Sequence, residues 1–229
     1  MKLRTLAALA VGILGANTAL AIPTLQLDID GGTYVGGSEE STITNDPTFD
    51  LWALGKTSGV NTAVDYYLSI ALLPQTQNPG DIANFGGVTV NGTALSTLPG
   101  SPEYGKPGAL KQSHGIFDTY FYELAFRFAG DPTIPSYNVQ DGDAGPKKDE
   151  LFKHVFQIDA SALASGYGLH FDLYTYSDNG SNKTPFSHDA AYCNNRDCNP
   201  VKVSEPSTLA LFGVGLMSLV AIRRRLRRA

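Results

Sequence analysis

The chain has 229 residues, a formal net charge of −5 and 42% hydrophobic residues. Residues 22–205 carry ten basic side chains and all 22 acidic ones, a charge of −12, which argues against nucleic acid and anionic lipid as partners. This stretch is long enough for one domain with a substantial core, and its acidity fits a soluble protein outside the cell.

Residues 1–21 have the pattern of a secretory signal peptide. Basic residues near the start precede an apolar run over 6–16, and Ala19 and Ala21 give the small-x-small pattern of a cleavage site. The run is short for a membrane span, which favours cleavage over an uncleaved anchor. We therefore expect an exported protein whose mature chain begins at Ile22.

Residues 22–198 are expected to form one domain of strands and turns. The ranges that predict strands are 24–30, 33–35, 48–54, 64–73, 88–90, 119–128, 151–158 and 169–176. The continuous apolar run at 64–73 favours a central strand, although a buried helix has the same pattern. Residues 161–165 could form one helical turn. Prolines and glycines predict long loops at 98–115 and 129–149.

Alternation within these ranges predicts which side chains share a face. Phe49, Leu51 and Ala53 should lie on one side of their strand, and Trp52 on the other. The second strong alternation places the following residues on or near one face: Tyr120, Tyr122, Leu124, Phe126 and Phe128. Asn91-Gly92 after a short strand is typical of a hairpin turn.

The fold class expected from this pattern is an all-β, two-sheet β-sandwich. Seven to nine strands with frequent turn signals fit an immunoglobulin-like sandwich or a jelly roll, and the long loops favour the jelly roll. Residues 199–205 would be a tether. Residues 206–229 would be a single short transmembrane helix with a basic end, because five arginines follow an apolar run.

The two cysteines, Cys193 and Cys198, are separated by four residues. In an oxidising compartment this spacing favours a disulfide that closes a small loop. A structural zinc site would need four ligands, and only His188 lies nearby in the sequence. A redox pair would have two intervening residues, not four.

An acidic loop contains the candidate metal ligands Asp141, Asp143, Asp149 and Glu150. Calcium prefers six to eight oxygen ligands, so a loose calcium site is one interpretation. A solvated acidic loop is the interpretation that such charge clusters favour, and no other cofactor is expected. Asp28 and Asp30, which precede Gly31-Gly32, are interpreted as turn residues.

The histidines do not form a recognisable catalytic pattern. His154 and His170 lie in predicted strands beside aromatic residues, where packing is the usual role. A triad could be written from Ser113, His188 and Asp189, but adjacent histidine and aspartate cannot easily form the required hydrogen bond. We therefore expect no enzymatic activity.

The end of the chain has a sorting pattern, a polar motif followed by an apolar stretch and arginines. The motif residues are Val203, Ser204, Glu205, Pro206, Ser207, Thr208 and Leu209. They resemble the PEP-CTERM sorting signal, except that Ser204 stands where that family usually has proline. The resemblance implies an exosortase-like partner that cuts near the motif after transient anchoring in the inner membrane, with delivery to the surface or matrix. A permanent single-pass anchor is the alternative.

Scattered fragments of the domain resemble the choice-of-anchor N group of small surface proteins. They are 25–29, 49–54, 114–117, 119–121 and 185–189. The function expected is non-enzymatic association with exopolysaccharide or biofilm matrix. The alternatives are a passive structural surface protein and an extracellular carbohydrate-active enzyme, for which Glu123, Glu103 and Glu150 are the carboxylates to test.

Overall fold

The computed structural model describes residues 24–36, 41–73, 85–98, 102–105, 119–141, 149–176 and 189–194. Thirteen strands lie in these ranges, with two short 3-10 helices and no longer helix. The strands are β1 Leu25–Ile29, β2 Thr33–Val35, β3 Ser41–Thr44, β4 Thr48–Lys56, β5 Tyr66–Leu73, β6 Thr89–Val90, β7 Thr93–Ala94, β8 Glu103–Gly105, β9 Thr119–Phe126, β10 Thr133–Pro135, β11 Glu150–Asp159, β12 Gly168–Tyr174 and β13 Asp189–Tyr192. The 3-10 helices are η1 Leu95–Thr97 and η2 Val139–Asp141.

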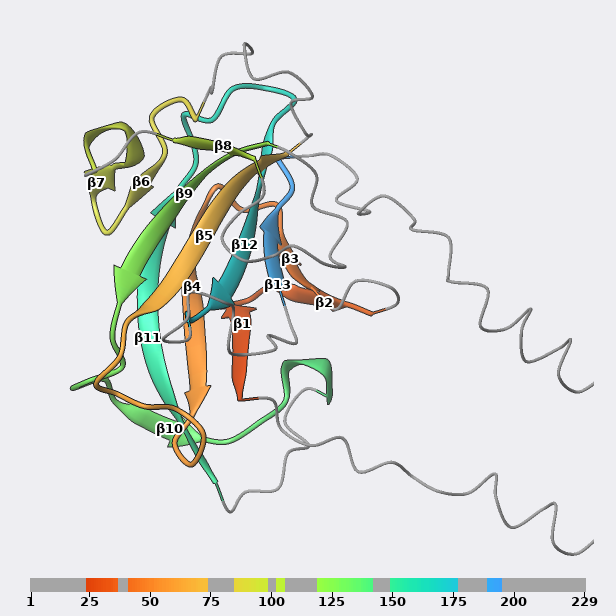
Figure 1. Ribbon diagram of the computed structural model, residues 1–229. Helices are drawn as coiled ribbons and strands as arrows, with labels where there is room; N and C mark the ends of the chain where they lie inside the picture. The colour runs from red at the N-terminus through yellow and green to blue at the C-terminus, as the bar shows by residue number, and fades with distance from the viewer. Residues whose placement is uncertain are drawn as a thin grey trace, which may run out of the picture.

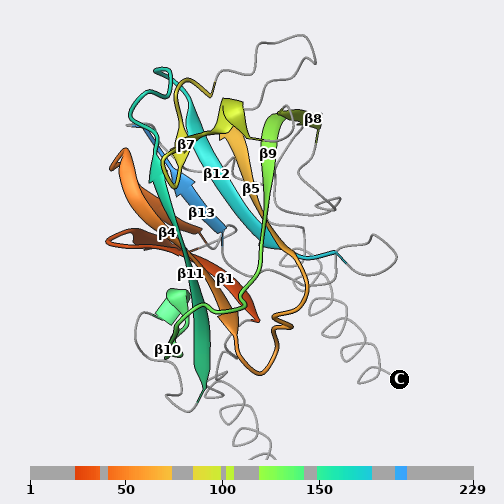
Figure 2. The same cartoon turned by 90° about the vertical axis from the view of Figure 1, so that its left-hand side faces the viewer.

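The strands form two sheets that pack against each other (Figures 1 and 2). Sheet A has the order β1-β4-β11-β6-β7, with β10 also paired to β11. Sheet B has the order β2-β3-β13-β12-β5-β9-β8. All pairs are antiparallel except β3 with β13, which are parallel. The expectation of an all-β, two-sheet sandwich is confirmed.

The core lies between the two sheets and follows the period-two alternation of the strands. Phe49, Leu51 and Ala53 of β4 point into it, as predicted, and Trp52 lies on the opposite face. From β9, the inward side chains are the predicted Tyr120, Tyr122, Leu124 and Phe126. Phe128, which follows β9, is also fully buried in this core. Burial of these apolar and aromatic side chains is the main stabilising contribution to the fold.

The hairpin predicted at Asn91-Gly92 joins β6 to β7. Asn91 has φ +52° and Gly92 has φ +76°, the left-handed pair that a type I′ turn requires. The Asn91 side chain also accepts a hydrogen bond of 2.8 Å from the backbone amide of Gln157 in β11. The turn is therefore fixed to sheet A as well as closed on itself.

The described part of the predicted loop 129–149, residues 129–141, contains β10 and η2, and its second half packs on the outer face of sheet A. Tyr137 donates its hydroxyl to Asp28 Oδ2 at 2.6 Å, and its carbonyl oxygen accepts a 2.8 Å bond from Gln26. Val139 packs with Leu54 in a second, smaller core on this face. Asp28 is therefore an anchor within β1 and not a turn residue, and burial raises the pKa of its carboxyl group.

Several other expectations from the sequence are corrected. The number of strands exceeds the seven to nine expected, because five strands lie outside the predicted ranges: β3, β7 and β13, and also β8 and β10 in the predicted loops 98–115 and 129–149. Residues 161–163 form a turn and a bend, not a helical turn.

Among the described residues, no helix is long and apolar enough to cross a membrane. The helix expected over 206–229 and the signal peptide expected over 1–21 both lie outside the described residues.

Candidate functional site

The outer face of sheet B carries polar side chains that are nevertheless buried. Within β12, Leu169, Phe171 and Leu173 point into the core, so the alternate residues point away from it. These alternate residues include His170 and Asp172, which are 6% and 0% exposed. Polar groups buried to this degree need hydrogen-bond or ion partners that compensate for the loss of water, so the outward face of β12 is the candidate site.

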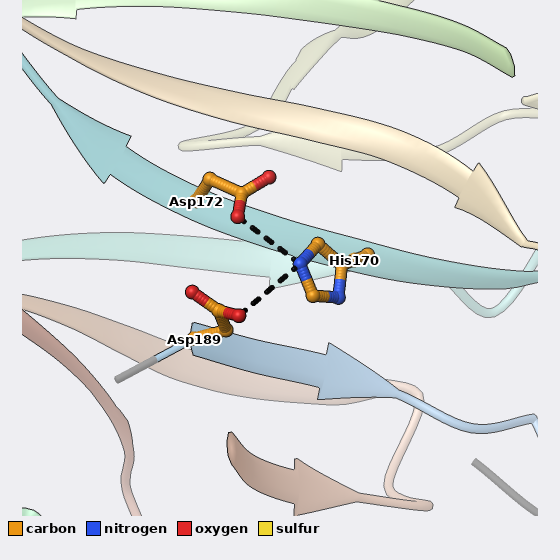
Figure 3. A group of neighbouring side chains, drawn as sticks. All are labelled: His170, Asp172 and Asp189. Carbon is orange, nitrogen blue, oxygen red and sulfur yellow. Dashed lines mark hydrogen bonds and ion pairs between the residues drawn. The ribbon is translucent and has the colours of Figure 1, made fainter. Parts of the chain in front are cut away.

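His170, Asp172 and Asp189 form a compact cluster on this face (Figure 3). The Nε2 atom of His170 lies 3.1 Å from Asp172 Oδ1 and 3.6 Å from Asp189 Oδ2. Both carboxylates point toward this one nitrogen from neighbouring strands, β12 and β13 (Figure 3). Their side chains are 0% and 5% exposed, so the two negative charges lie close together in a site that contains little solvent.

This arrangement has two chemical readings. With the imidazole protonated, the cluster is a buried ion group in which His170 compensates part of the carboxylate charge. With the imidazole neutral, one nitrogen and two carboxylate oxygens form a donor set suited to a divalent transition metal. All three donor atoms lie within 4.8 Å of one another, which brings them close enough to share one ion.

A tyrosine group lies beside the cluster on the same face. Tyr174 and Tyr176 both donate their hydroxyls to Glu123 Oε1, the second at 3.0 Å. Tyr67 packs against both rings, with centroids 6.1 Å and 4.9 Å away. Ser69 lies between Glu123 and Asp172 in the sheet register, so the backbones of these two acidic residues are about two strand spacings, ~10 Å, apart.

The tyrosine group should make the fold sensitive to alkali. Burial, together with the hydrogen bond to Glu123, raises the pKa of Tyr174 above its usual 10, and the same causes raise that of Tyr176 to about 12. A tyrosine that keeps its proton in the folded state but loses it in the unfolded state stabilises the fold fully below pH 10. That contribution is lost progressively as the pH rises from the unfolded toward the folded pKa.

We expect Tyr174→Phe to lower the free energy of unfolding at pH 7 by about 1.5–3 kcal/mol, because a hydrogen bond to a carboxylate is lost. Above pH 10, the stability of the variant should fall less steeply than that of the wild type, by up to about 1.4 kcal/mol per pH unit. Urea unfolding between neutral and alkaline pH measures both effects. Parallel curves for the two proteins above pH 10 would contradict the assignment.

The residues predicted as calcium ligands are only partly described. Asp149 forms a 2.8 Å salt bridge with Lys56, and Glu150 is exposed at the start of β11. Asp141 ends η2, and Asp143 lies outside the described residues. Since a lysine ammonium contacts Asp149, a cation at that carboxylate would have to displace it. The calcium site therefore stays a prediction.

Other predicted site residues lie at the border of the described chain or outside it. Cys193 is 1% exposed and is not a free thiol, but Cys198 lies outside the described residues, so their pairing stays a prediction. The cleavage residues Ala19, Ala21 and Ile22 also lie outside, as do all seven residues of the sorting motif. Asp189, which the sequence analysis considered with Ser113 and His188 as a triad, contacts His170 at 3.6 Å, and Ser113 and His188 lie outside the described residues.

A groove at one end of the sandwich is lined by carboxylates. Asp30 lies after β1, Asp46 before β4, Asp50 within β4 and Asp159 at the end of β11. Two of them stabilise their own turns, since Asp46 accepts hydrogen bonds from Thr48 and Asp159 accepts them from Ser161. Asp30 is exposed, and Asp50 is half-buried. The groove therefore presents acceptor oxygens to solvent.

Comparison with known proteins identifies the end of the chain. Residues 202–225 match the family model for the PEP-CTERM protein-sorting motif, which confirms the resemblance of that segment. The motif indicates an exported protein that is targeted to an exosortase and delivered to the cell surface. No curated protein and no solved structure matches the chain.

Proposed function

We propose that this protein is a non-enzymatic component of the extracellular matrix. Residues 1–21 export it, the tail holds it transiently in the inner membrane, and an exosortase-type enzyme cuts near Glu205. The β-sandwich then associates with exopolysaccharide. The observation that carries the proposal is the PEP-CTERM motif at residues 202–225.

The chemistry of the domain supports association with a sugar polymer. The groove presents Asp30 and Asp50, whose carboxylate oxygens can accept hydrogen bonds from sugar hydroxyls. The charge of −12 over residues 22–205 favours a neutral polymer, or an acidic one held through cations. The fragments that resemble the choice-of-anchor N group support the same class of small surface protein.

Co-sedimentation tests the proposal. Protein recovered from the exterior of producing cells should sediment with exopolysaccharide extracted from the same cells. The double variant Asp30→Asn/Asp50→Asn should bind at least roughly tenfold more weakly, because two charge-assisted hydrogen bonds are weakened. Asp65→Asn is the matched control, since this exposed aspartate pairs with Arg127 and is not part of the groove lining.

Two outcomes would overturn the proposal. Wild-type protein that stays in the supernatant would rule out matrix association. Shortening of the polymer by the wild type, lost in Glu123→Gln, would favour the carbohydrate-active enzyme. The burial of Asp172 argues against the enzyme. A glycosidase needs two carboxylates that reach the sugar, but Asp172, which lies across β5 from Glu123, is 0% exposed.

A further inference from the structure

We propose that His170, Asp172 and Asp189 bind one divalent transition-metal ion, of which zinc fits best. The ligands come from paired strands, β12 and β13, so their positions are set by the sheet and not by a loop. His170 and Asp172 are two residues apart and therefore share the outward face. Asp189, at the start of β13, reaches the same point from the neighbouring strand (Figure 3).

The two distances from His170 agree with a tetrahedral zinc site. Zinc binds imidazole nitrogen and carboxylate oxygen at about 2.0–2.2 Å, which separates neighbouring ligand atoms by about 3.4 Å in a tetrahedron. The two separations from His170 Nε2 are 3.1 Å and 3.6 Å and lie on either side of that value. The third separation, between the two carboxylate oxygens, is at most 4.8 Å, so all three donor atoms lie close enough to share one ion.

The charge of these three side chains is compatible with a bound cation. Even with His170 protonated, these three side chains together carry one excess negative charge, and all of them are buried. A divalent ion with neutral His170 makes the same group neutral, which lowers the cost of burying the two carboxylates. The nitrogen ligand favours zinc over calcium or magnesium, since both prefer oxygen ligands.

The neighbouring strand supplies a second, independent observation. Ser69 of β5 lies directly opposite Asp172 in the sheet, and side chains in such a pair share one face. It is 0% exposed, and its hydroxyl has no hydrogen-bond partner in the part of the chain that the structure describes. A water bound to the metal would satisfy this hydroxyl, as outer-shell groups commonly do at zinc sites.

An ion here would stabilise the described strand that lies nearest the sorting signal in the sequence. β13 has only four residues, and it is the last described strand before the motif at 202–225. The metal would join its first residue to β12 in addition to the backbone hydrogen bonds. Because the unfolded chain lacks the assembled site, binding would stabilise the fold, and the stabilisation would rise with the logarithm of the metal concentration above the dissociation constant.

Metal content and zinc titration test this site. Protein recovered from the cell exterior is stripped with a chelator, then titrated with zinc chloride in a calorimeter and analysed by mass spectrometry for metal. The wild type should bind about one zinc per chain and should unfold at a higher temperature with zinc than without. Cobalt in place of zinc should give the visible absorption of a tetrahedral site.

Variants locate the ion. Asp172→Asn and Asp189→Asn, which keep the side-chain shape, should lose the bound zinc. Ser69→Ala should keep the stoichiometry but weaken affinity by roughly 10- to 100-fold. His154→Gln is the matched control, since His154 also pairs with an aspartate, Asp131 at 2.9 Å, on another part of the fold.

The proposal is wrong if the stripped wild type takes up no zinc. That result does not depend on whether any variant folds. It is equally wrong if both asparagine variants bind zinc as the wild type does. In the first case, the cluster would be a buried ion group with a protonated His170. Neither result bears on whether the protein binds polysaccharide, which the groove variants test separately.

Discussion

Replacing Glu205 and Pro206 together with alanine is expected to stop release of the protein from the cell. These residues lie near the start of the segment, residues 202–225, that matches the sorting motif. Proline disfavours helical backbone in the residue before it, so we expect loss of Pro206 to make the motif a poorer substrate for a processing enzyme. The exterior fraction of the variant should fall nearly to zero, and the cell-bound chain should keep its arginine-rich end.

Intact mass of the exterior and cell-bound protein measures this effect. The wild type should begin at Ile22 and end near Glu205. Ser204→Pro is the matched variant, because it introduces the proline that the PEP-CTERM family usually has, and it should be processed at least as completely as the wild type. Exterior wild-type chains that retain Arg223 and the residues after it would show that the tail is a permanent anchor.

The longer strands could be predicted from the sequence because their alternation is strong. β4 and β9 place large apolar or aromatic residues at every second position, and such a pattern has one stable orientation against a core. The faces assigned to Leu51 and Tyr122 were correct for this reason. The ends were less certain, since β4 extends two residues beyond the predicted range, to Lys56.

The short strands could not be predicted because their partners determine them. β13 reads Asp-Ala-Ala-Tyr, which has little strand propensity, and it is a strand because β12 and β3 pair with it on either side. β10 contains Pro135 in a range that reads as a loop, yet it pairs with β11 at an edge, where proline is tolerated. Tertiary pairing decided both cases.

The candidate metal cluster could also be predicted only in part from the sequence. The spacing of His170 and Asp172 in a predicted strand already places both side chains on one face, so two of the three cluster residues could be placed together from the sequence. The burial of His170 and Asp172 could not be predicted, because an alternating strand is expected to turn its polar side chains toward solvent. Asp189 could not be assigned either, since only the pairing of β13 with β12 brings it to His170.

Gly86→Ala is expected to lower the free energy of unfolding by about 2–5 kcal/mol. Gly86 has φ +57°, a conformation that costs other residues about 1–2 kcal/mol. An added methyl group would also lie against the carbonyl oxygen of Ala162, 3.0 Å from its carbonyl carbon and 3.2 Å from Leu163 Cα. These are backbone atoms that cannot rotate away, so overpacking adds a further cost of about 1–3 kcal/mol.

Gly92→Ala separates these two contributions. Gly92 also has a positive φ, +76°, but an added methyl group there meets no atom within 4 Å. This variant should therefore lose only the conformational cost, about 1–2 kcal/mol. Urea unfolding of the two variants and the wild type measures the difference. Equal losses would mean that the segment around Gly86 moves away from Ala162 without cost. The packing of Phe85 on Tyr122, with ring centroids 4.9 Å apart, would then contribute little to the stability of that end of the core.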